Sequence, residues 1–165
     1  MIRQAVLDDA ADLAKVVKQV ERESPFMLYE SGERDISTEK QLQMIHHLVN
    51  KHNSNIFVTI QDGHIVGYLF AIGGSTNKTK HCAHIVIGVI EAYRGKGIGS
   101  SLFRELEKWA KGKLHRLELT VITENNAGIN LYEKAGFIIE GVKKHSLYMD
   151  NRFVDEYYMG KLLEG

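Results

Sequence analysis

Residues 93–100 read Tyr-Arg-Gly-Lys-Gly-Ile-Gly-Ser, and three of the chain's 15 glycines fall in this stretch, at Gly95, Gly97 and Gly99. An apolar segment precedes the glycines and an amphipathic pattern follows them, so the cluster is predicted to join a buried strand to a helix. Glycines let the backbone turn sharply and let its N–H groups approach a ligand. The N-terminus of a helix adds unpaired donors and partial positive charge. The junction, with two basic side chains interleaved, therefore favours a bound anion, phosphate above all.

The spacing of these glycines excludes two common phosphate-binding motifs. A Walker loop requires Gly-x-x-x-x-Gly-Lys-Ser/Thr, which is absent here. The dinucleotide fingerprint Gly-x-Gly-x-x-Gly fails because the third glycine comes one residue early. For this stretch taken alone, an ordinary glycine-rich turn between a strand and a helix remains the structural alternative.

Hydrophobic periodicity along the rest of the chain predicts a single α/β domain over residues 1–165. Strands are expected over 2–6, 56–60, 64–72, 84–90, 117–121, 137–142 and 153–162, and helices over 9–24, 38–49, 97–111 and 126–135. Tight turns are expected at Asp62-Gly63 and Asp150-Asn151, and a capping box is expected to begin at Thr38. The resulting order of elements is β-α-α-β-β-β-α-β-α-β-β.

Composition narrows the class of protein. The chain has 21 Lys+Arg, 21 Asp+Glu and 44% hydrophobic residues, which supports a packed core and argues against a protein that coats nucleic acid. The longest apolar run, residues 85–90, is far shorter than the roughly 20 residues of a membrane span, and no signal peptide is visible. The single cysteine, Cys82, excludes a disulfide framework and a cysteine-rich zinc site. We therefore expect a soluble cytoplasmic protein with no metal and no nucleic-acid or membrane partner.

A second motif lies downstream, where residues 125–137 read Asn-Asn-Ala-Gly-Ile-Asn-Leu-Tyr-Glu-Lys-Ala-Gly-Phe. This stretch and Arg94-x-x-Gly97-x-Gly99 resemble the two ordered signatures of the GCN5-related N-acetyltransferases (GNAT): Gln/Arg-x-x-Gly-x-Gly/Ala and Asn-x-x-Ala-x-x-Leu-Tyr-x-Lys-x-Gly-Phe. Gly128 stands where the family usually has alanine, which is expected to loosen that helix slightly. The resemblance covers essentially the whole chain, and in both cases the first signature joins the fourth strand to the third helix.

The resemblance implies a mixed, partly splayed β-sheet, flanked by about four helices and open in a V between its fourth and fifth strands. The implied co-substrate is acetyl-CoA, whose pantetheine arm would pair with backbone groups around Val89 and Ile90. Backbone N–H groups would hold its pyrophosphate, from a loop made of Arg94, Gly95, Lys96, Gly97, Ile98, Gly99 and Ser100. Gly88 either marks a bulge in the fourth strand or packs closely against a neighbour.

Three residues of the second motif have roles implied by the family. Tyr132 aligns with the tyrosine that serves as general acid toward the CoA sulfur, and the alternative is an aromatic anchor for its helix. Asn125 would contact the pantetheine arm, or it caps the helix. Lys134 resembles the basic residue near the 3′-phosphate of CoA, or it is a solvated lysine.

The general base is expected at His84, because several members carry Glu or His at the beginning of the fourth strand and an imidazole titrates near neutral pH. The alternative is a structural histidine, with water and backbone carbonyls accepting the proton as in many relatives.

The acceptor site is expected between residues 23–34 and 145–158, the most variable parts of the family. Phe26, Met27 and Tyr29 would form an apolar wall. The carboxylates of Glu30, Asp155 and Glu156 would attract a cationic amine, or they form a solvated face, and none of the three is singled out. The implied acceptor is a primary amine of an amino acid, a small amine or a peptide N-terminus. At the family level, homodimerisation through the last strands is also expected.

The leading hypothesis is therefore an acetyl-CoA-dependent N-acetyltransferase. The alternative from a different class is a catalytically silent CoA-binding sensor with the same fold, which the lack of a carboxylate on the fourth strand leaves open. A nucleotide-phosphate binder is the third interpretation, and it predicts that ATP binds at least as tightly as acetyl-CoA.

Overall fold

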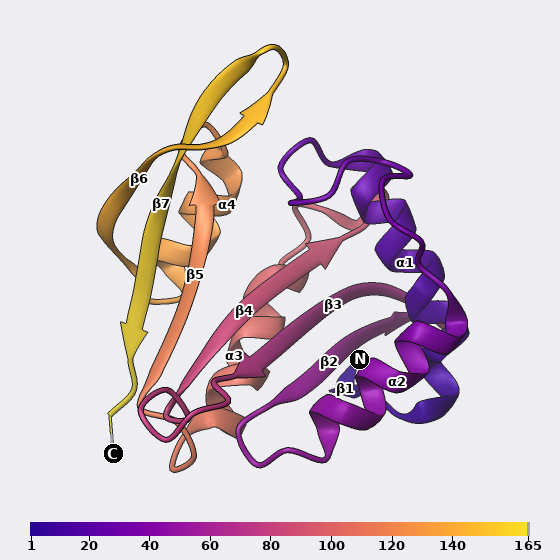
Figure 1. Cartoon of the computed structure of the whole chain (residues 1–165). Helices are drawn as coiled ribbons and strands as arrows, with labels where there is room; N and C mark the ends of the chain where they lie inside the picture. The colour runs from indigo at the N-terminus through magenta and orange to yellow at the C-terminus, as the bar shows by residue number, and fades with distance from the viewer. Residues whose placement is uncertain (165) are drawn as a thin grey trace.

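The computed structural model describes residues 1–164 as one seven-stranded sheet with four α-helices (Figure 1). The strands are β1 (Ile2–Gln4), β2 (Asn55–Gln61), β3 (His64–Gly73), β4 (Cys82–Val89), β5 (Arg116–Ile122), β6 (Ile138–Met149) and β7 (Arg152–Leu162). The helices are α1 (Ala10–Glu23), α2 (Thr38–Val49), α3 (Ile98–Ala110) and α4 (Asn126–Lys134), with short 3-10 turns η1 (Leu7–Asp9) and η2 (Glu91–Tyr93). The predicted order of strands and α-helices is confirmed.

The sheet is mixed and has the order β1-β2-β3-β4-β5-β7-β6. Its one parallel pair, among the described residues, is β4 with β5, and this pair holds only over Cys82–His84 against Arg116–Glu118. Beyond that point the strands separate, because β5 continues along β7 while β4 continues along β3 (Figure 1). The predicted V between the fourth and fifth strands is confirmed, and its apex lies at His84.

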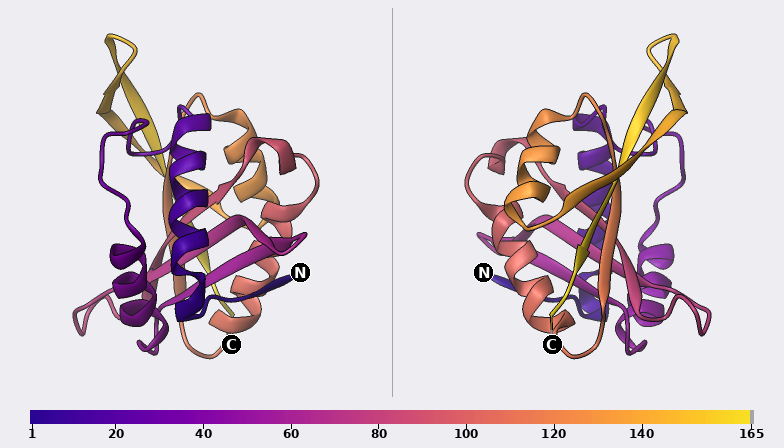
Figure 2. Two further views of the ribbon diagram at one scale, coloured as in Figure 1. Left: turned by 90° about the vertical axis from the view of Figure 1, so that its right-hand side faces the viewer. Right: turned by 90° about the vertical axis from the view of Figure 1, so that its left-hand side faces the viewer.

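Helices cover both faces of the sheet (Figure 2). One apolar cluster lies between the sheet and α3, and a second lies between the sheet and the pair α1 and α2. Alternate residues of β4 show the division: Ile85 packs in the cluster that holds Leu102 and Leu106 of α3, whereas Val86 packs against the cluster of α1 and α2. The same alternation places Leu117 and Leu119 of β5 in the α3 cluster. Side chains at the intervening positions of β4, β5 and β7 therefore face the side of α1 and α2.

Two local expectations needed correction. The cap of α2 is Ser37, whose hydroxyl accepts a hydrogen bond from the Lys40 N–H, so Thr38 is the first helical residue and not the cap. Strand β6 extends seven residues beyond the expected end at 142, because pairing with β7 continues, with a shift of register between Lys143 and Leu147, into a hairpin that has no regular apolar alternation. The turns at Asp62-Gly63 and Asp150-Asn151 are confirmed, with positive φ at all four residues.

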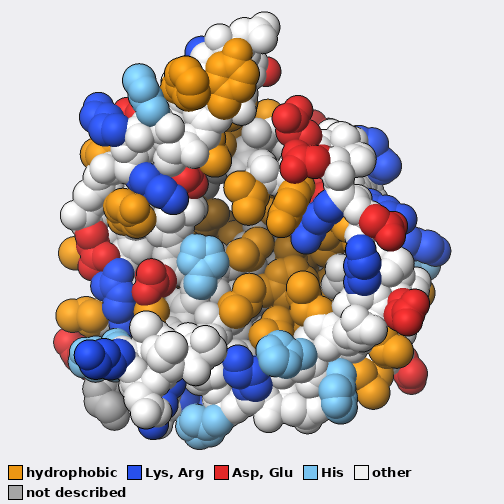
Figure 3. Space-filling model, in the orientation of Figure 1, with side chains coloured by type: hydrophobic (Ala, Val, Ile, Leu, Met, Phe, Trp, Pro, Cys, Tyr) orange, Lys and Arg blue, Asp and Glu red, His pale blue; other side chains and the backbone are white. Residues whose placement is uncertain are grey.

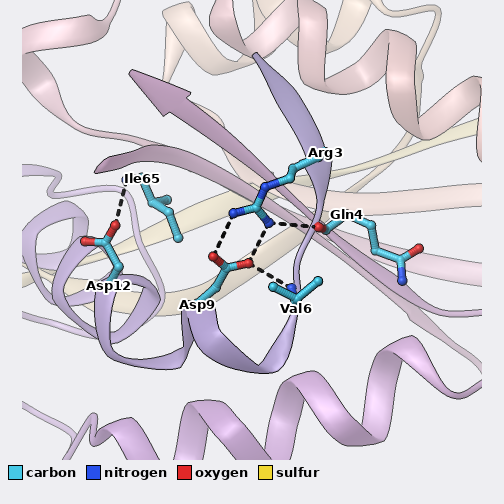
Figure 4. A network of polar contacts seen from close by, with 6 residues as sticks. All are labelled: Arg3, Gln4, Val6, Asp9, Asp12 and Ile65. Atoms are coloured by element: carbon cyan, nitrogen blue, oxygen red, sulfur yellow. Dashed lines mark hydrogen bonds and ion pairs between the residues drawn. The ribbon is translucent and has the colours of Figure 1, made fainter. Parts of the chain in front are cut away.

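An ion pair fixes the start of α1 to β1 (Figure 4). Both terminal nitrogens of Arg3 donate to the Asp9 carboxylate, at 2.7 and 2.9 Å, and the Val6 N–H donates to the same group at 2.8 Å. One turn later, the Asp12 carboxylate accepts from the Ile65 N–H of β3 at 2.9 Å. The hydrogen bonds from Arg3 hold the pKa of Asp9 below its usual range, and the Val6 N–H acts in the same direction.

Asp9→Asn is expected to lower the free energy of unfolding at neutral pH by about 1–2 kcal/mol, because it removes a charge-assisted pair and keeps an acceptor for Val6. Because the pKa of Asp9 is lower in the folded protein than in the unfolded chain, the ionised carboxylate stabilises the fold at any pH above the pKa of the unfolded chain. This contribution is lost as the pH falls through the lower pKa of the folded protein. The difference between wild type and variant should therefore shrink below about pH 4. Denaturant unfolding at pH 7 and pH 3 measures the difference in the free energy of unfolding, with exposed Asp8→Asn as the control. An equal difference at both pH values would contradict a stabilising ion pair between Asp9 and Arg3.

No helix within residues 1–164 combines the length and the apolar content that crossing a membrane requires.

Candidate active site

A cleft of about 690 Å³ runs through the V between β4 and β5. Its walls come from four places: the end of α1 with the loop that follows, β4 with the glycine loop, the facing side of β5 and β7, and α4. Hydrophobic side chains gather in the hollow between the two halves of the molecule (Figure 3). The cleft thus joins the two predicted motifs to the expected acceptor region.

The glycine loop presents free backbone donors to one end of the cleft. Gly95 and Gly97 have φ of 75° and 81°, a left-handed geometry that favours glycine, and Gly97 is the N-cap of α3. Within the described residues, the N–H groups of 95–100 donate to no protein acceptor, and the first helical bond is Ser101 N–H to the Gly97 carbonyl. A row of unpaired N–H groups at a helix N-terminus fits the pyrophosphate of CoA.

The two basic residues of this loop differ in position. Arg94 lines the cleft, and its Nε donates to the Val89 carbonyl at 3.0 Å, which fixes the loop to the end of β4. Lys96 lies outside the lining, with its Nζ 5.1 Å from the centre of the Tyr93 ring. Only Arg94 is therefore placed to act inside the cleft.

Other residues of the implied CoA path fall into two groups. Val89, Ile98, Gly99, Ser100, Asn125 and Lys134 line the cleft. Ile90 does not line the cleft. Its N–H donates to the Val66 carbonyl at 3.0 Å, so this backbone donor is not free for pantetheine. The Val89 carbonyl is likewise engaged by Arg94.

Two glycines are explained by close packing. A Cβ on Gly88 would lie 2.5 Å from the Tyr68 ring, and β4 pairs with β3 in continuous register through Gly88, so the bulge expectation is wrong and the packing alternative holds. A Cβ on Gly128 would lie 2.5 Å from the Asn125 amide nitrogen. Asn125 caps α4 by accepting from the Gly128 N–H at 3.0 Å, so glycine at 128 makes room for the capping side chain.

Tyr132 packs its ring into the aromatic cluster below α4 and also lines the cleft. Its ring packs edge-on against Phe103 and Phe137, at centroid distances of 5.8 and 6.4 Å, and the residue lines the cleft. Burial raises the pKa of its hydroxyl to about 12. The phenol therefore stays protonated at neutral pH and is able to donate a proton.

His84 lies at the apex of the V and lines the cleft. His84 is exposed in the open cleft, but the protein atoms around the imidazole partly displace water from it, and this desolvation lowers the pKa of His84 from its ordinary value against the opposing attraction of Glu118 and Glu156. The ring is therefore neutral near pH 7 and able to accept a proton.

The three acceptor residues are separated by the structure. Phe26 lines the cleft together with its neighbours Met27 and Leu28, whereas Tyr29 and Glu30 do not. Arg34 bonds to the buried Glu21 carboxylate of α1 and stacks 4.2 Å above the Tyr29 ring, which keeps that ring away from the cleft. The Glu30 N–H donates to Glu33 within the loop, and the Glu30 side chain is exposed. The expectation that Tyr29 and Glu30 line the acceptor site is therefore corrected.

Of the three carboxylates expected to attract a cationic amine, Glu156 is the one that lines the cleft. It is only 9% exposed and lines the cleft on the side opposite the glycine loop, and Ser146 Oγ donates to its Oε1 at 2.9 Å. Its alternation with Val154, which is also buried, is the signal that could have identified it as inward-facing.

Comparison with known proteins gives a consistent result. The family model described as acetyltransferase (GNAT) family matches residues 16–137. The chain is 33% identical over 105 residues to the L-amino acid N-acetyltransferase AaaT of Escherichia coli K12, a match that covers 61% of this chain and 64% of that protein, less than two thirds of its length.

Solved structures extend the likeness over nearly the whole chain. A GNAT-family acetyltransferase of Streptococcus pneumoniae is 31% identical with a TM-score of 0.95, over 99% of both chains. A phosphinothricin acetyltransferase of Sinorhizobium meliloti, solved in complex with acetyl-CoA, shares the fold at 19% identity, with a TM-score of 0.86 over 99% of this chain and 88% of that one.

Proposed function

This chain belongs to the acetyltransferase (GNAT) family, and on that premise we propose that it transfers the acetyl group of acetyl-CoA to a primary amine. The observation that carries the proposal is the cleft itself, which joins the unpaired N–H groups of residues 95–100 to Tyr132 and His84. The S. meliloti structure supports the choice of co-substrate, because a protein with this fold holds acetyl-CoA.

Each residue has a defined task in this reaction. Bound acetyl-CoA supplies a thioester carbonyl that an amine can attack. The loop from Gly95 to Ser100 holds the pyrophosphate through its N–H groups and so orients the thioester along the V. His84 takes a proton from the bound ammonium, directly or through a water, and the resulting neutral amine attacks the thioester carbonyl.

Tyr132 acts at the other side of the transferred group. As the new C–N bond forms and the C–S bond breaks, its hydroxyl gives a proton to the departing sulfur. The products are the acetylated amine and free CoA, and the proton taken up by His84 returns to Tyr132 through solvent.

Measuring amine-dependent release of free CoA tests the proposal. The enzyme is incubated with acetyl-CoA and a panel of amines, amino acids and short peptides, and acetyl-CoA affinity is determined separately by calorimetry. Turnover with at least one amine is expected. Acetyl-CoA binding without turnover across the panel would favour the silent sensor, and tighter binding of ATP than of acetyl-CoA would favour the nucleotide binder.

The lowered pKa of His84 gives a prediction for pH dependence. The neutral imidazole is the active form, so kcat should rise with pH through an inflection below 6.5 and then level off. His84→Gln is expected to lower the plateau by about 10²-fold and to flatten this limb of the profile. Exposed His64→Gln of β3, outside the cleft lining, is the control. An unchanged profile in His84→Gln would assign the proton to water or to a backbone carbonyl instead.

We also propose a cytoplasmic enzyme that dimerises through its last two strands. The location is supported by Cys82, whose thiol is buried and donates to Glu118. These surroundings raise the pKa of the thiol to about 12, so it is no candidate for disulfide exchange.

The dimer is supported by the projecting hairpin of β6 and β7 (Figure 2). This hairpin exposes the aromatic side chains of Tyr148 and Phe153, which favours a partner at this surface.

A further inference from the structure

We propose that the acceptor is a primary amine with an apolar substituent and without a carboxylate next to its amino group, and that Glu156 binds its ammonium form. This inference rests on the proposed acetyltransferase function and specifies the substrate class of the same site. Three features of the cleft support this inference. They are a buried carboxylate without an ion-pair partner, the position of the basic side chains of the cleft away from that carboxylate, and an apolar wall.

Glu156 places a carboxylate in the wall of the cleft. It is 9% exposed, and within residues 1–164 it forms no ion pair; its one side-chain hydrogen bond comes from the Ser146 hydroxyl. The neighbouring carboxylate of Glu118 differs, since it lies 3.5 Å from the Arg116 guanidinium and accepts from Cys82. A buried, unpaired carboxylate is unfavourable unless a cation joins it, and an ammonium is that cation.

Glu156 also faces the side from which an acceptor enters. Its neighbours in sequence, Tyr157 and Met159, pack in the α3 cluster, so Glu156 points to the side of α1 and α2. His84 points to the same side of the sheet, because Ala83 and Ile85 belong to the α3 cluster. An ammonium bound to Glu156 thus lies on the face where His84 is able to take its proton.

Cations that could hold a substrate carboxylate lie elsewhere. Besides His84, the basic residues that line the cleft are Arg94 and Lys134. Arg94 is bonded to the Val89 carbonyl beside the glycine loop, and Lys134 ends α4 on the α3 side of the sheet (Figure 2). Lys143 is opposite Glu156 in the strand register, but it is outside the cleft lining, with its Nζ 5.9 Å from the Tyr158 ring centre. The carboxylate of a free α-amino acid would therefore face Glu156 with no counter-ion.

The remaining acceptor wall is apolar. Phe26, Met27 and Leu28 of the loop after α1 line it, together with Val20 of α1 and Leu147 of the hairpin. These side chains come from both halves of the molecule. Figure 3 shows hydrophobic side chains gathered in the hollow between the two halves. They suit a hydrocarbon or aromatic substituent on the amine, since burial of such a group is favourable in proportion to its area.

The test compares three amines that share one side chain: 2-phenylethylamine, L-phenylalaninamide and L-phenylalanine. Binding to the enzyme with CoA is measured by calorimetry, and turnover is measured with acetyl-CoA. We expect the first two, or one of them, to bind at least tenfold more tightly than phenylalanine and to show a kcat/KM at least tenfold higher. A preference for the amide indicates a peptide N-terminus as the source of the amine, and a preference for 2-phenylethylamine indicates a free amine.

Glu156→Gln removes the charge and keeps an acceptor for Ser146. It is expected to weaken binding of the preferred amine about tenfold and to narrow the discrimination against phenylalanine, with acetyl-CoA affinity unchanged. Asp155→Asn is the matched control: it also removes a β7 carboxylate, but Asp155 bonds to Lys144 and the His145 N–H outside the cleft. Asp155→Asn should keep the wild-type affinity for the preferred amine and the wild-type discrimination against phenylalanine.

Equal or tighter binding of phenylalanine by the wild type would overturn the inference, as would binding of none of the three amines or unchanged discrimination in Glu156→Gln. Because binding is measured with CoA, these results do not depend on turnover. Selective amine binding without acetyl transfer would instead contradict the proposed function.

Discussion

Tyr132→Phe is expected to lower kcat by about 10²-fold or more while acetyl-CoA affinity changes little. The change removes the proton donor and keeps the ring, whose contacts with Phe103 and Phe137 hold α4 in place. In the wild type, burial keeps the Tyr132 hydroxyl protonated between pH 6 and pH 9. The loss of kcat in the variant should therefore be the same throughout this pH range. Stopped-time assays of CoA release give kcat, and calorimetry gives the affinity.

Tyr148→Phe is the control for this substitution, since Tyr148 lies exposed on the hairpin and outside the cleft lining. It should match the wild type in kcat. If Tyr132→Phe kept a normal kcat, Tyr132 would be an aromatic anchor only, and another group or water would protonate the departing sulfur.

Gly97→Val is expected to weaken acetyl-CoA binding by roughly 100-fold or more. Gly97 has a φ of 81°, which a β-branched residue avoids at a cost of about 1–2 kcal/mol. The loop would therefore relax, and N–H groups that bond a charged pyrophosphate would turn away, at about 1.5–3 kcal/mol for each lost bond. Equilibrium binding of acetyl-CoA measures the effect.

Gly112→Val separates loss of binding from loss of stability. Gly112 also has a positive φ, of 78°, and open space around it, but it lies beyond the other end of α3. Both variants should lose similar stability in thermal unfolding, and only Gly97→Val should lose acetyl-CoA. Normal binding by Gly97→Val would mean that the glycine loop does not hold the phosphate groups.

Much of the fold could be predicted because its signals are local. Apolar residues at helical spacing, the turn at Asp62-Gly63 and the glycines after β4 each act within a few neighbours in sequence. The length of β6 could not be predicted, because its outer part is held by backbone pairing to β7 and carries exposed polar residues. Backbone pairing leaves no hydrophobic pattern for sequence reasoning to find.

The candidate site also has a part that local sequence predicts and a part that it does not. The glycine loop, Tyr132 and Asn125 belong to continuous motifs, and the structure brings them to one cleft. The acceptor side is assembled from distant segments, so long-range contacts decide which residues face inward. Tyr29 is drawn away by the bond between Arg34 and Glu21, whereas Glu156 is turned inward by the alternation of β7.

The bond between Arg34 and Glu21 has no signature in local sequence. For Glu156, the alternation with Val154 is a local signal for the inward direction, but it does not show that a cleft lies there. A carboxylate in a strand such as β7 reads as a solvated residue until the neighbouring strands are placed around it. The same holds for His84, whose position at the apex of the V follows from the pairing of β4 with β5.

The central claim is tested most directly by mass-spectrometric detection of the acetylated amine together with the CoA released in the same reaction. The wild type should form one N-acetylated product for each CoA released, and Tyr132→Phe should lose both signals in parallel. CoA release without an acetylated amine, or acetyl-CoA binding with no amine-dependent release, would contradict an N-acetyltransferase.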